Sequence, residues 1–255
     1  MTFGTVEWAR ATGGAVTGWT RLNQLRESIV FQLRDGLRRA PKEAGFAGAD
    51  EVERALRETT LPETELVAAC HALVEGLGPE ALVGHVVRTY VWGTLLGLRD
   101  GLTWDREVFA CAALLHDVAL ARRDRTFACF AHDGAEQATA FLEERGVSGA
   151  RVARVADAIC LHLRVEVPTS LGTEAHLVHA GAGLDVVGRR VHELSGNVRA
   201  AVLERHPRGD VVDVLVRAFR EERRLHPAAR VGRWMALGFS HFIRHNPLDG
   251  HARAR

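Results

Sequence analysis

The sequence predicts an all-α protein, and two observations carry this prediction. From residue 61 onward, apolar residues recur at helical spacing, and residues typical of helix starts and ends separate the periodic segments. No segment with the strand-like alternation of apolar and polar residues stands out, since the best candidate, 165–168, is too short. At 255 residues, 47% hydrophobic and 25% charged, the chain can bury a sizeable core. We therefore expect a helical bundle with one main domain and an N-terminal helical extension.

Residues 1–60 are predicted to form the N-terminal extension. A glycine-rich start leads into one amphipathic helix over 19–39. The stretch 41–50, rich in alanine and glycine, is typical of a connection. No role for the extension follows from these patterns.

Helices are expected to follow one another through the rest of the chain. Pro62 and Pro79 stand where helices should begin, because proline at the first helical position loses a donor that would be unpaired anyway. Gly101 and Gly146 stand where helices should end, because glycine accepts the left-handed cap. We assign 61–192 to the main domain and 193–255 to C-terminal helices packed on this core. The predicted helices cover 63–76, 80–99, 105–120, 133–145, 149–163, 174–192, 197–205, 210–224 and 228–244.

The charge balance excludes some classes of partner. The formal net charge is +1, from 33 Lys and Arg against 32 Asp and Glu, and the basic residues are scattered along the chain. This distribution argues against a nucleic-acid surface, which needs a basic patch. No stretch approaches the ~20 apolar residues of a membrane-spanning helix. The expected partner is instead a small-molecule substrate, and self-association into a homo-oligomer stays open.

Cysteine usage and the N-terminus predict a cytoplasmic protein. The cysteines are far apart and show no paired spacing, so we expect small buried side chains that stay reduced. The first 19 residues mix charged residues with glycines and lack the apolar run of a signal peptide. The four cysteines are Cys70, Cys111, Cys129 and Cys160.

The candidate chemistry starts at His116 and Asp117, which close the strongly apolar helix predicted over 105–120. Burying an imidazole and a carboxylate there is costly unless a partner compensates them, and a divalent cation would compensate both. His85 and Asp185, lone ionisable residues on two other apolar helices, are the further ligands we expect. Two imidazoles and two carboxylates can hold one divalent metal, Zn first, with Fe, Mn or Ni as alternatives.

A simpler interpretation exists for each of these residues. His116 and Asp117 could form a satisfied buried pair, and His85 could be a core histidine bonded to a backbone carbonyl. Asp185 could pair with Arg189, which lies four residues further along the same predicted helix.

Other candidates lie nearby in the sequence. A second His-Asp dipeptide, His132 and Asp133, stands at a predicted helix start, where Asp133 is expected to act as an N-cap or first-turn acid. His162 ends a predicted helix, where it either complements the helix dipole or reaches the site as a catalytic residue. His132 and His162 together could hold a second metal. Arg88, three residues beyond His85, could bind an anionic substrate or form an ion pair.

Three further histidines flank Asp185 in the sequence. None of them lies three or four residues from Asp185, so none is an obvious neighbour on the helix surface. We therefore expect surface or interface positions for His176, His179 and His192.

The order of these residues resembles the HD-domain superfamily, whose members show a His, then a His-Asp pair, then a distant Asp on successive helices around one or two metals. The resemblance implies an HD-domain helical bundle in which His85, His116, Asp117 and Asp185 hold the metal. It covers about residues 60–190. Further segments are similar to one branch, the cyanamide-hydratase-like proteins, at 61–64, 85–90, 113–117, 130–135, 158–162 and 184–188.

Two positions depart from that branch. Ala131 follows Phe130, where the branch commonly has an acidic residue, and Val86 follows His85, where a small polar residue is usual. Both changes remove polar groups near the expected pocket. They argue against cyanamide itself as the substrate.

The ligand set and the resemblance together predict an enzyme that uses a metal-activated water. A divalent metal lowers the pKa of bound water from ~15.7 towards ~7. The branch implies that this water adds to a carbon–nitrogen multiple bond of a nitrile- or cyanamide-like molecule, with Asp117 or His162 moving the proton.

Three alternatives stay open. The first is a phosphohydrolase acting on a nucleotide or another phosphoester, the commonest activity in the superfamily. Its candidate basic residues are Arg88, Arg122, Arg123 and Arg125. The second is a di-iron oxygenase, and the third is a non-catalytic HD module that binds a small ligand.

Overall fold

The computed structural model describes residues 1–16, 18, 46, 48–121 and 129–251. Over these residues the chain forms twelve α-helices and no strand, which confirms the all-α prediction. The helix expected over 19–39 lies outside the described residues. The α-helices are α1 (Val6–Thr12), α3 (Ala49–Glu58), α4 (Glu65–Leu77), α5 (Glu80–Arg99), α6 (Arg106–Leu115), α7 (Phe130–Glu143), α8 (Gly149–Leu161), α9 (Thr173–Val187), α10 (Gly196–Arg205), α11 (Val211–Leu225), α12 (Arg230–Ala236) and α13 (Phe239–Arg244). The 3-10 turns are η1 (Val118–Leu120), η2 (Thr169–Leu171), η3 (Val191–Glu193) and η4 (Pro247–His251).

Helix α5 has the predicted bounds, 80–99, whereas glycines move the ends of other helices. The helix predicted over 174–192 ends earlier, as α9, because Gly188 takes a left-handed conformation with φ of 71° and caps it. The helix predicted over 228–244 is two helices, α12 and α13, because Gly238 between them has φ of 86°. The segment 228–244 therefore bends at Gly238, where the sequence alone predicted one continuous helix.

The end of α6 bears directly on the site. The sequence predicts one helix over 105–120, but α6 ends at Leu115 and a 3-10 turn begins at Val118. His116 and Asp117 therefore occupy the junction between the two elements rather than the body of a helix. Both residues directly follow the buried end of α6, in which every residue from Val108 to Leu115 is buried.

Helices α5 and α9 pack closely at the centre of the bundle, and glycine makes this approach possible. A Cβ added at Gly181 of α9 would lie 2.0 Å from the carbonyl oxygen of Thr89 in α5. A Cβ added at Gly93 of α5 would lie 2.7 Å from the carbonyl oxygen of Leu177 in α9. This contact brings residues of α5 and α9 to the same part of the core.

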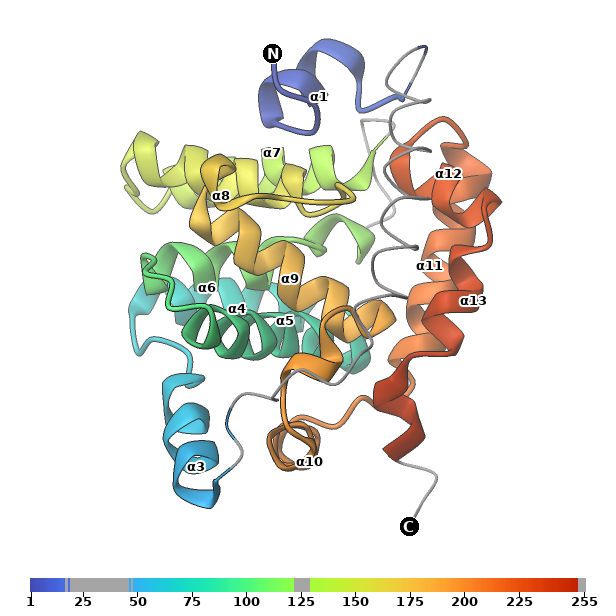
Figure 1. Cartoon of the computed structure of the whole chain (residues 1–255). Helices are drawn as coiled ribbons and strands as arrows, with labels where there is room; N and C mark the ends of the chain where they lie inside the picture. The colour runs from blue at the N-terminus through green and yellow to red at the C-terminus, as the bar shows by residue number, and fades with distance from the viewer. Residues whose placement is uncertain (17, 19–45, 47, 122–128, 252–255) are drawn as a thin grey trace.

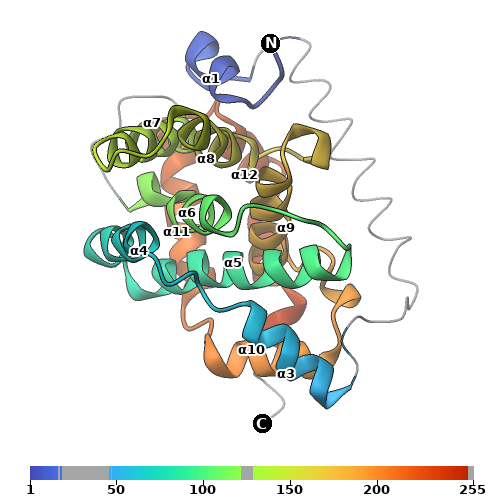
Figure 2. The same ribbon diagram turned by 90° about the vertical axis from the view of Figure 1, so that its left-hand side faces the viewer.

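The remaining helices surround this pair. Helix α1 lies on α7 and α8 at one end of the molecule, and α3 and α10 pack together at the other (Figures 1 and 2). Between the two ends, α4, α6 and α8 complete the main core, where the rings of Tyr90 and Phe109 stack at 5.0 Å.

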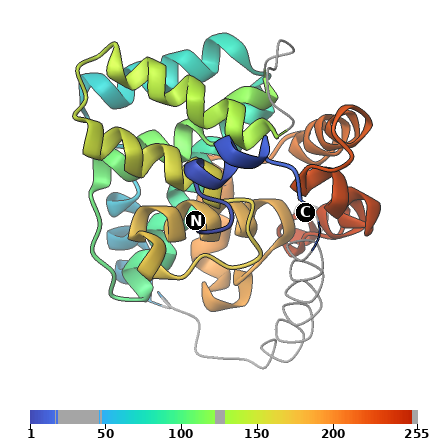
Figure 3. The same ribbon diagram turned by 90° about the horizontal axis from the view of Figure 1, so that it is seen from above.

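The C-terminal helices α11, α12 and α13 stand together along one side, as Figures 1 and 3 show. Helix α11 packs on α5, and α13 packs on α9. Phe219 of α11 stacks on Phe130 of α7 at 6.1 Å, and Ile243 of α13 is fully buried. The C-terminal helices thus cover the core on the side where α9 ends. Of the helices that the structure describes, none has the length and apolar character needed to cross a bilayer.

Candidate metal centre

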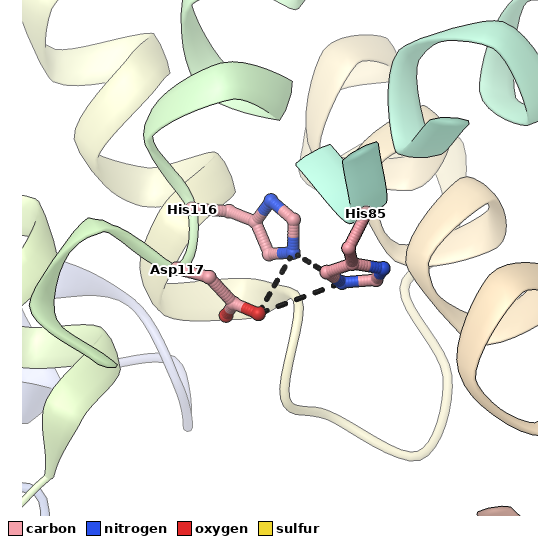
Figure 4. A group of neighbouring side chains, drawn as sticks. All are labelled: His85, His116 and Asp117. Atoms are coloured by element: carbon pink, nitrogen blue, oxygen red, sulfur yellow. Dashed lines mark hydrogen bonds and ion pairs between the residues drawn. The ribbon is translucent and has the colours of Figure 1, made fainter. Parts of the chain in front are cut away.

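Three donor atoms meet in the core where α5 faces the end of α6 (Figure 4). Nε2 of His85 lies 3.3 Å from Nε2 of His116, and each of these nitrogens lies 3.5 Å from Oδ2 of Asp117. All three side chains are buried. A tetrahedral cation with ligand bonds of ~2.0–2.1 Å has ligand-to-ligand edges of about 3.3–3.4 Å. The three atoms therefore form a triangle of the size of one face of such a site.

Each imidazole of this triangle is held by its other nitrogen. Nδ1 of His116 donates to the carbonyl oxygen of Ala113 at 2.7 Å, and Nδ1 of His85 donates to Oδ2 of Asp185 at 2.8 Å. In the neutral rings, both Nε2 atoms are then bare acceptors that face each other and the Asp117 carboxylate. Buried acceptors in this arrangement need a positive charge between them, so the donor set fits a divalent cation.

A proton on His85 competes for the same place. Burial lowers the pKa of His85, but the carboxylates of Asp117 and Asp185 outweigh burial and raise it above its usual value. Burial also works against ionised Asp117, yet His116, His85 and His162 around it bring its pKa well below the usual range. A cation would therefore meet an ionised Asp117 and would compete with a proton for Nε2 of His85.

Asp185, expected as the fourth ligand, does not join the triangle. Its two oxygens accept five hydrogen bonds, whose donors are Nδ1 of His85, Nε and Nη2 of Arg88, Nε1 of Trp92 and Nη1 of Arg208, at 2.8–3.1 Å. A carboxylate offers about four lone-pair sites, so these donors use its whole capacity. In place of a direct contact with the triangle, Asp185 fixes the ring of His85 from behind.

Arginines balance the charge of the buried Asp185 carboxylate. Burial alone would raise the pKa of Asp185, but Arg88, His85 and Arg208 hold it well below its usual range. The alternative partner Arg189 is not among these residues. The arginines come from α5 and from the turn after α10, so the sequence spacing along α9 could not reveal them.

Arg88, expected to bind an anionic substrate, points away from the triangle. Its side chain is fully buried, with Nε and Nη2 on Asp185 and Nη1 on the carbonyl oxygen of Pro207 at 2.7 Å. All three nitrogens of the guanidinium are engaged within the protein, and Arg88 forms the ion pair with Asp185, the alternative that the sequence left open.

His162, expected as a catalytic residue, is brought to the site. It caps the end of α8, and its Nδ1 donates to the carbonyl oxygen of Ile159 at 2.6 Å. Its Nε2 lies 3.7 Å from Oδ1 of Asp117, the oxygen that does not belong to the triangle, and its ring meets that of His116 edge to face at 4.9 Å. Burial, with His116 adding to it, lowers the pKa of His162 to about 3. The imidazole is therefore neutral and presents a bare nitrogen to Asp117.

His132, expected with His162 at a second metal, lies elsewhere. Helix α7 begins at Phe130, before the predicted start, and its first turn holds His132 and Asp133. Nε2 of His132 lies 3.4 Å from Oε1 of Glu136 on the same helix. Of the two histidines, the structure brings only His162 to the triangle.

The triangle forms part of the wall of a cavity of about 270 Å³. Most of the other walls are apolar and come from α9, from the loop after α8 and from the C-terminal helices. The lining residues outside the triangle are His162, Leu163, Arg164, Val165, His179, Ala182, Gly183, Val186, Val187, Arg189, Phe219, Trp234, Leu237, Phe239 and Phe242. The run Arg122, Arg123 and Arg125, which the sequence offered as basic residues near the metal, lies outside the described residues.

The sequence did not predict which face of α9 would line this cavity. The lining residues His179, Ala182 and Val186 follow helical spacing, and Asp185 lies off that face. His179 was expected at the surface but is 7% exposed. Its spacing to Ala182 and Val186 could have signalled a shared face, but nothing in the sequence says that this face meets the cavity.

The comparisons with known proteins agree with this geometry. A family model described as the HD domain matches residues 82–222, more than half of the 255-residue chain. The match includes the whole triangle, together with Asp185 and His162. No curated protein matches the chain.

Proposed function

The chain belongs to the HD domain family, and on this premise we propose that it is a metal-dependent enzyme whose single divalent cation is held by His85, His116 and Asp117. The observation that carries the proposal is the buried triangle of bare donor atoms with edges of 3.3–3.5 Å. Its size favours Zn, and Fe, Mn and Ni accept the same mixed nitrogen and oxygen donors. Asp185 acts as the residue that orients His85, a role that carboxylates commonly have towards metal-bound histidines.

The protein supplies the proton-handling groups beside this site. A bound divalent cation acidifies water and polarises an electrophile. The two oxygens of Asp117 have different neighbours: Oδ2 belongs to the triangle, and Oδ1 lies near Nε2 of His162. Neutral His162 can therefore accept a proton near Asp117 and return it to the reacting molecule. The apolar side chains of Val186, Phe219 and Phe239 line the rest of the cavity and favour an apolar part of a bound molecule.

The first candidate reaction is hydration of a nitrile- or cyanamide-like carbon–nitrogen multiple bond. In this reaction the oxygen of water bonds to carbon and the protons pass to nitrogen, which gives an amide or urea without a leaving group. A single cation, one neutral base and a mostly apolar cavity are sufficient for it. The apolar lining of the cavity supports this candidate.

The second candidate is hydrolysis of a phosphoester. It is favoured by Arg164 and Arg189, which line the cavity and could face an anionic phosphate. A di-iron oxygenase needs a second metal between His132 and His162, and the position of His132 beside Glu136 gives that reaction no support.

The test combines metal analysis with a substrate screen. We expect about one metal per chain by mass spectrometry, lost in His116→Ala and kept in His132→Ala. The metal-loaded protein should then hydrate a member of a panel of nitriles and cyanamides; turnover of phosphoesters alone would select the second candidate.

Two results would contradict the proposal. One is that the parent protein binds none of Zn, Fe, Mn and Ni when each is offered in turn. The remaining interpretation would then be a non-catalytic ligand-binding module. The other is loss of metal in the His132 variant, which would require a second site.

A further inference from the structure

The cavity beside the donor triangle is lined by two chemically different sets of elements. Its ionisable lining residues come from α5, from the end of α6 and from residues 162–189. In the part of the chain that the structure describes, every lining residue from the C-terminal helices is aromatic or leucine. A molecule in this cavity therefore meets donor atoms from one set of elements and an apolar surface from the other. The apolar residues are Phe219 of α11, Trp234 of α12, Leu237 at the end of α12, and Phe239 and Phe242 of α13.

Three of these residues, Phe219, Trp234 and Phe239, form an aromatic wall. The ring of Phe239 lies 6.1 Å from that of Phe219 and 5.3 Å from that of Trp234. The ring of Phe130 on α7 lies 6.1 Å from that of Phe219 and 5.9 Å from that of His162. Aromatic rings pack against each other at centroid separations of ~4.5–7 Å. These contacts therefore join the aromatic wall to the histidine beside the donor triangle.

The other two residues, Leu237 and Phe242, form an apolar rim. Leu237 is 58% exposed and Phe242 is 42% exposed, although both line the cavity. A single exposed apolar side chain is common and indicates nothing by itself. Here two of them border the same cavity, next to an aromatic wall. Such a rim favours the entry of an apolar group.

The volume of the cavity exceeds what a very small substrate needs. It is about 270 Å³. An apolar protein cavity of ~150 Å³ is large enough to hold benzene. A molecule of the size of cyanamide would leave most of the aromatic wall without contact. A benzene ring, a short linker and a reacting group would together occupy the cavity.

Resting on the proposed function, we propose that the substrate is an amphipathic organic molecule, with a reacting group at the donor triangle and an aromatic or branched aliphatic body on the aromatic wall. The residues of the wall and rim then determine specificity, because packing against them removes the apolar body from water. The inference applies to either candidate reaction, since it concerns the part of the substrate that does not react.

The experiment measures binding without turnover, by titration calorimetry of the full chain. Acetamide and phenylacetamide share an uncharged amide, and methyl phosphate and phenyl phosphate share a phosphate. Only the apolar body differs within each pair. We expect the phenyl member of at least one pair to bind about 10- to 100-fold more tightly than the methyl member, because burial of a ring supplies the difference. Equal affinity within both pairs, or no binding of either phenyl probe, would overturn the inference.

Two variants locate the binding of the ring. Phe239→Ala removes the central ring of the wall, at a half-buried position, and should weaken binding of the phenyl probe by about 10-fold. Leu237→Ala changes an exposed side chain of the rim, so the fold should stay intact, and should weaken the same binding by about 3-fold. Binding of the methyl member should be unchanged in both variants.

The matched control is Leu225→Ala. Leu225 ends α11 and is 45% exposed, but it is not among the lining residues, so its replacement should leave binding unchanged. Phenyl-probe binding that is unaffected in the Leu237 variant, or reduced equally in the Leu225 variant, would overturn the assignment of the body to the wall and rim.

Metal analysis separates this inference from the proposed function. Ring-dependent binding that requires Leu237, in a protein that binds no metal, would support the apolar site and contradict the enzyme. Metal binding and turnover of small substrates, without any preference for a phenyl group, would support the enzyme and contradict the apolar site.

Discussion

The two ring nitrogens of His85 lie in the same buried side chain, but their surroundings differ. On the Nδ1 side, the Asp185 carboxylate is surrounded by donors from Arg88, Trp92 and Arg208, and its lone pairs are fully used. On the Nε2 side, acceptors face acceptors across 3.3–3.5 Å. The first side is a completed polar network, whereas the second needs either a cation or a proton on His85. A buried cluster of charged groups indicates a ligand site only where the protein supplies no hydrogen-bonding partner for its donors or acceptors.

The largest expected effect comes from breaking the completed side. Asp185→Ala removes the one carboxylate shared by two buried arginines and His85. We expect a loss of about 3–5 kcal/mol in the free energy of unfolding, because a buried charge left without its partner is strongly destabilising. Chemical denaturation measures this loss.

The control for that variant is Asp249→Ala. Asp249 also binds Arg208, at 2.8 Å, but its side chain is 31% exposed. Removal of the Asp249 carboxylate should cost about 1 kcal/mol or less, because water reaches this side chain and screens the pair. If both variants lost the same free energy of unfolding, burial would not explain a difference between Asp185 and Asp249, and the prediction would be wrong.

Asp185→Asn sharpens the comparison, because it keeps the shape of the side chain and weakens its hold on His85. We expect the metal affinity to fall by about 10- to 100-fold, the usual effect of altering a group that orients a metal-bound histidine. Metal titration measures the affinity, with Asp249→Asn as the control. X-ray absorption should show an unchanged set of protein ligands in the variant. A spectrum that loses one carboxylate would make Asp185 a ligand after all.

Measured over one pH unit, the smallest effect concerns His162, on the Nε2 side of the His85 ring. His162 has a pKa of about 3 in the fold, against 6.5 for an unperturbed histidine. Between these pH values His162 is protonated in the unfolded chain and neutral in the folded chain. The metal-free protein should therefore lose stability as the pH falls through this window. The contribution of one group reaches at most about 1.4 kcal/mol per pH unit.

His162→Gln should flatten this part of the stability curve. His85, whose pKa is raised, acts in the opposite direction, so the difference between variant and parent is the informative quantity. The control is His241→Gln, at an exposed position on α13. A slope that is the same in the parent and in the His162 variant would contradict the buried, neutral state of His162.

Some features of the site followed from the sequence alone. His85, His116 and Asp117 were predicted as site residues because burying ionisable groups in apolar helices is costly. The structure brings these three together. His162 was marked by its place at a helix end and reaches Asp117. Local spacing also determined the all-α class and the bounds of α5, because both depend on neighbours along the chain.

Other features were decided only by tertiary structure. Whether Asp185 faces the donor triangle or the arginines depends on the rotation of α9 against α5, which the close contact at Gly181 determines. The roles of Arg88 and Arg189 depend on which carboxylate or carbonyl the fold places beside each guanidinium. The aromatic wall comes from α11, α12 and α13, far from the triangle in the chain. A sequence specifies which side chains can be costly to bury, but only long-range packing decides which of them receive a partner from the protein and which are left for a ligand.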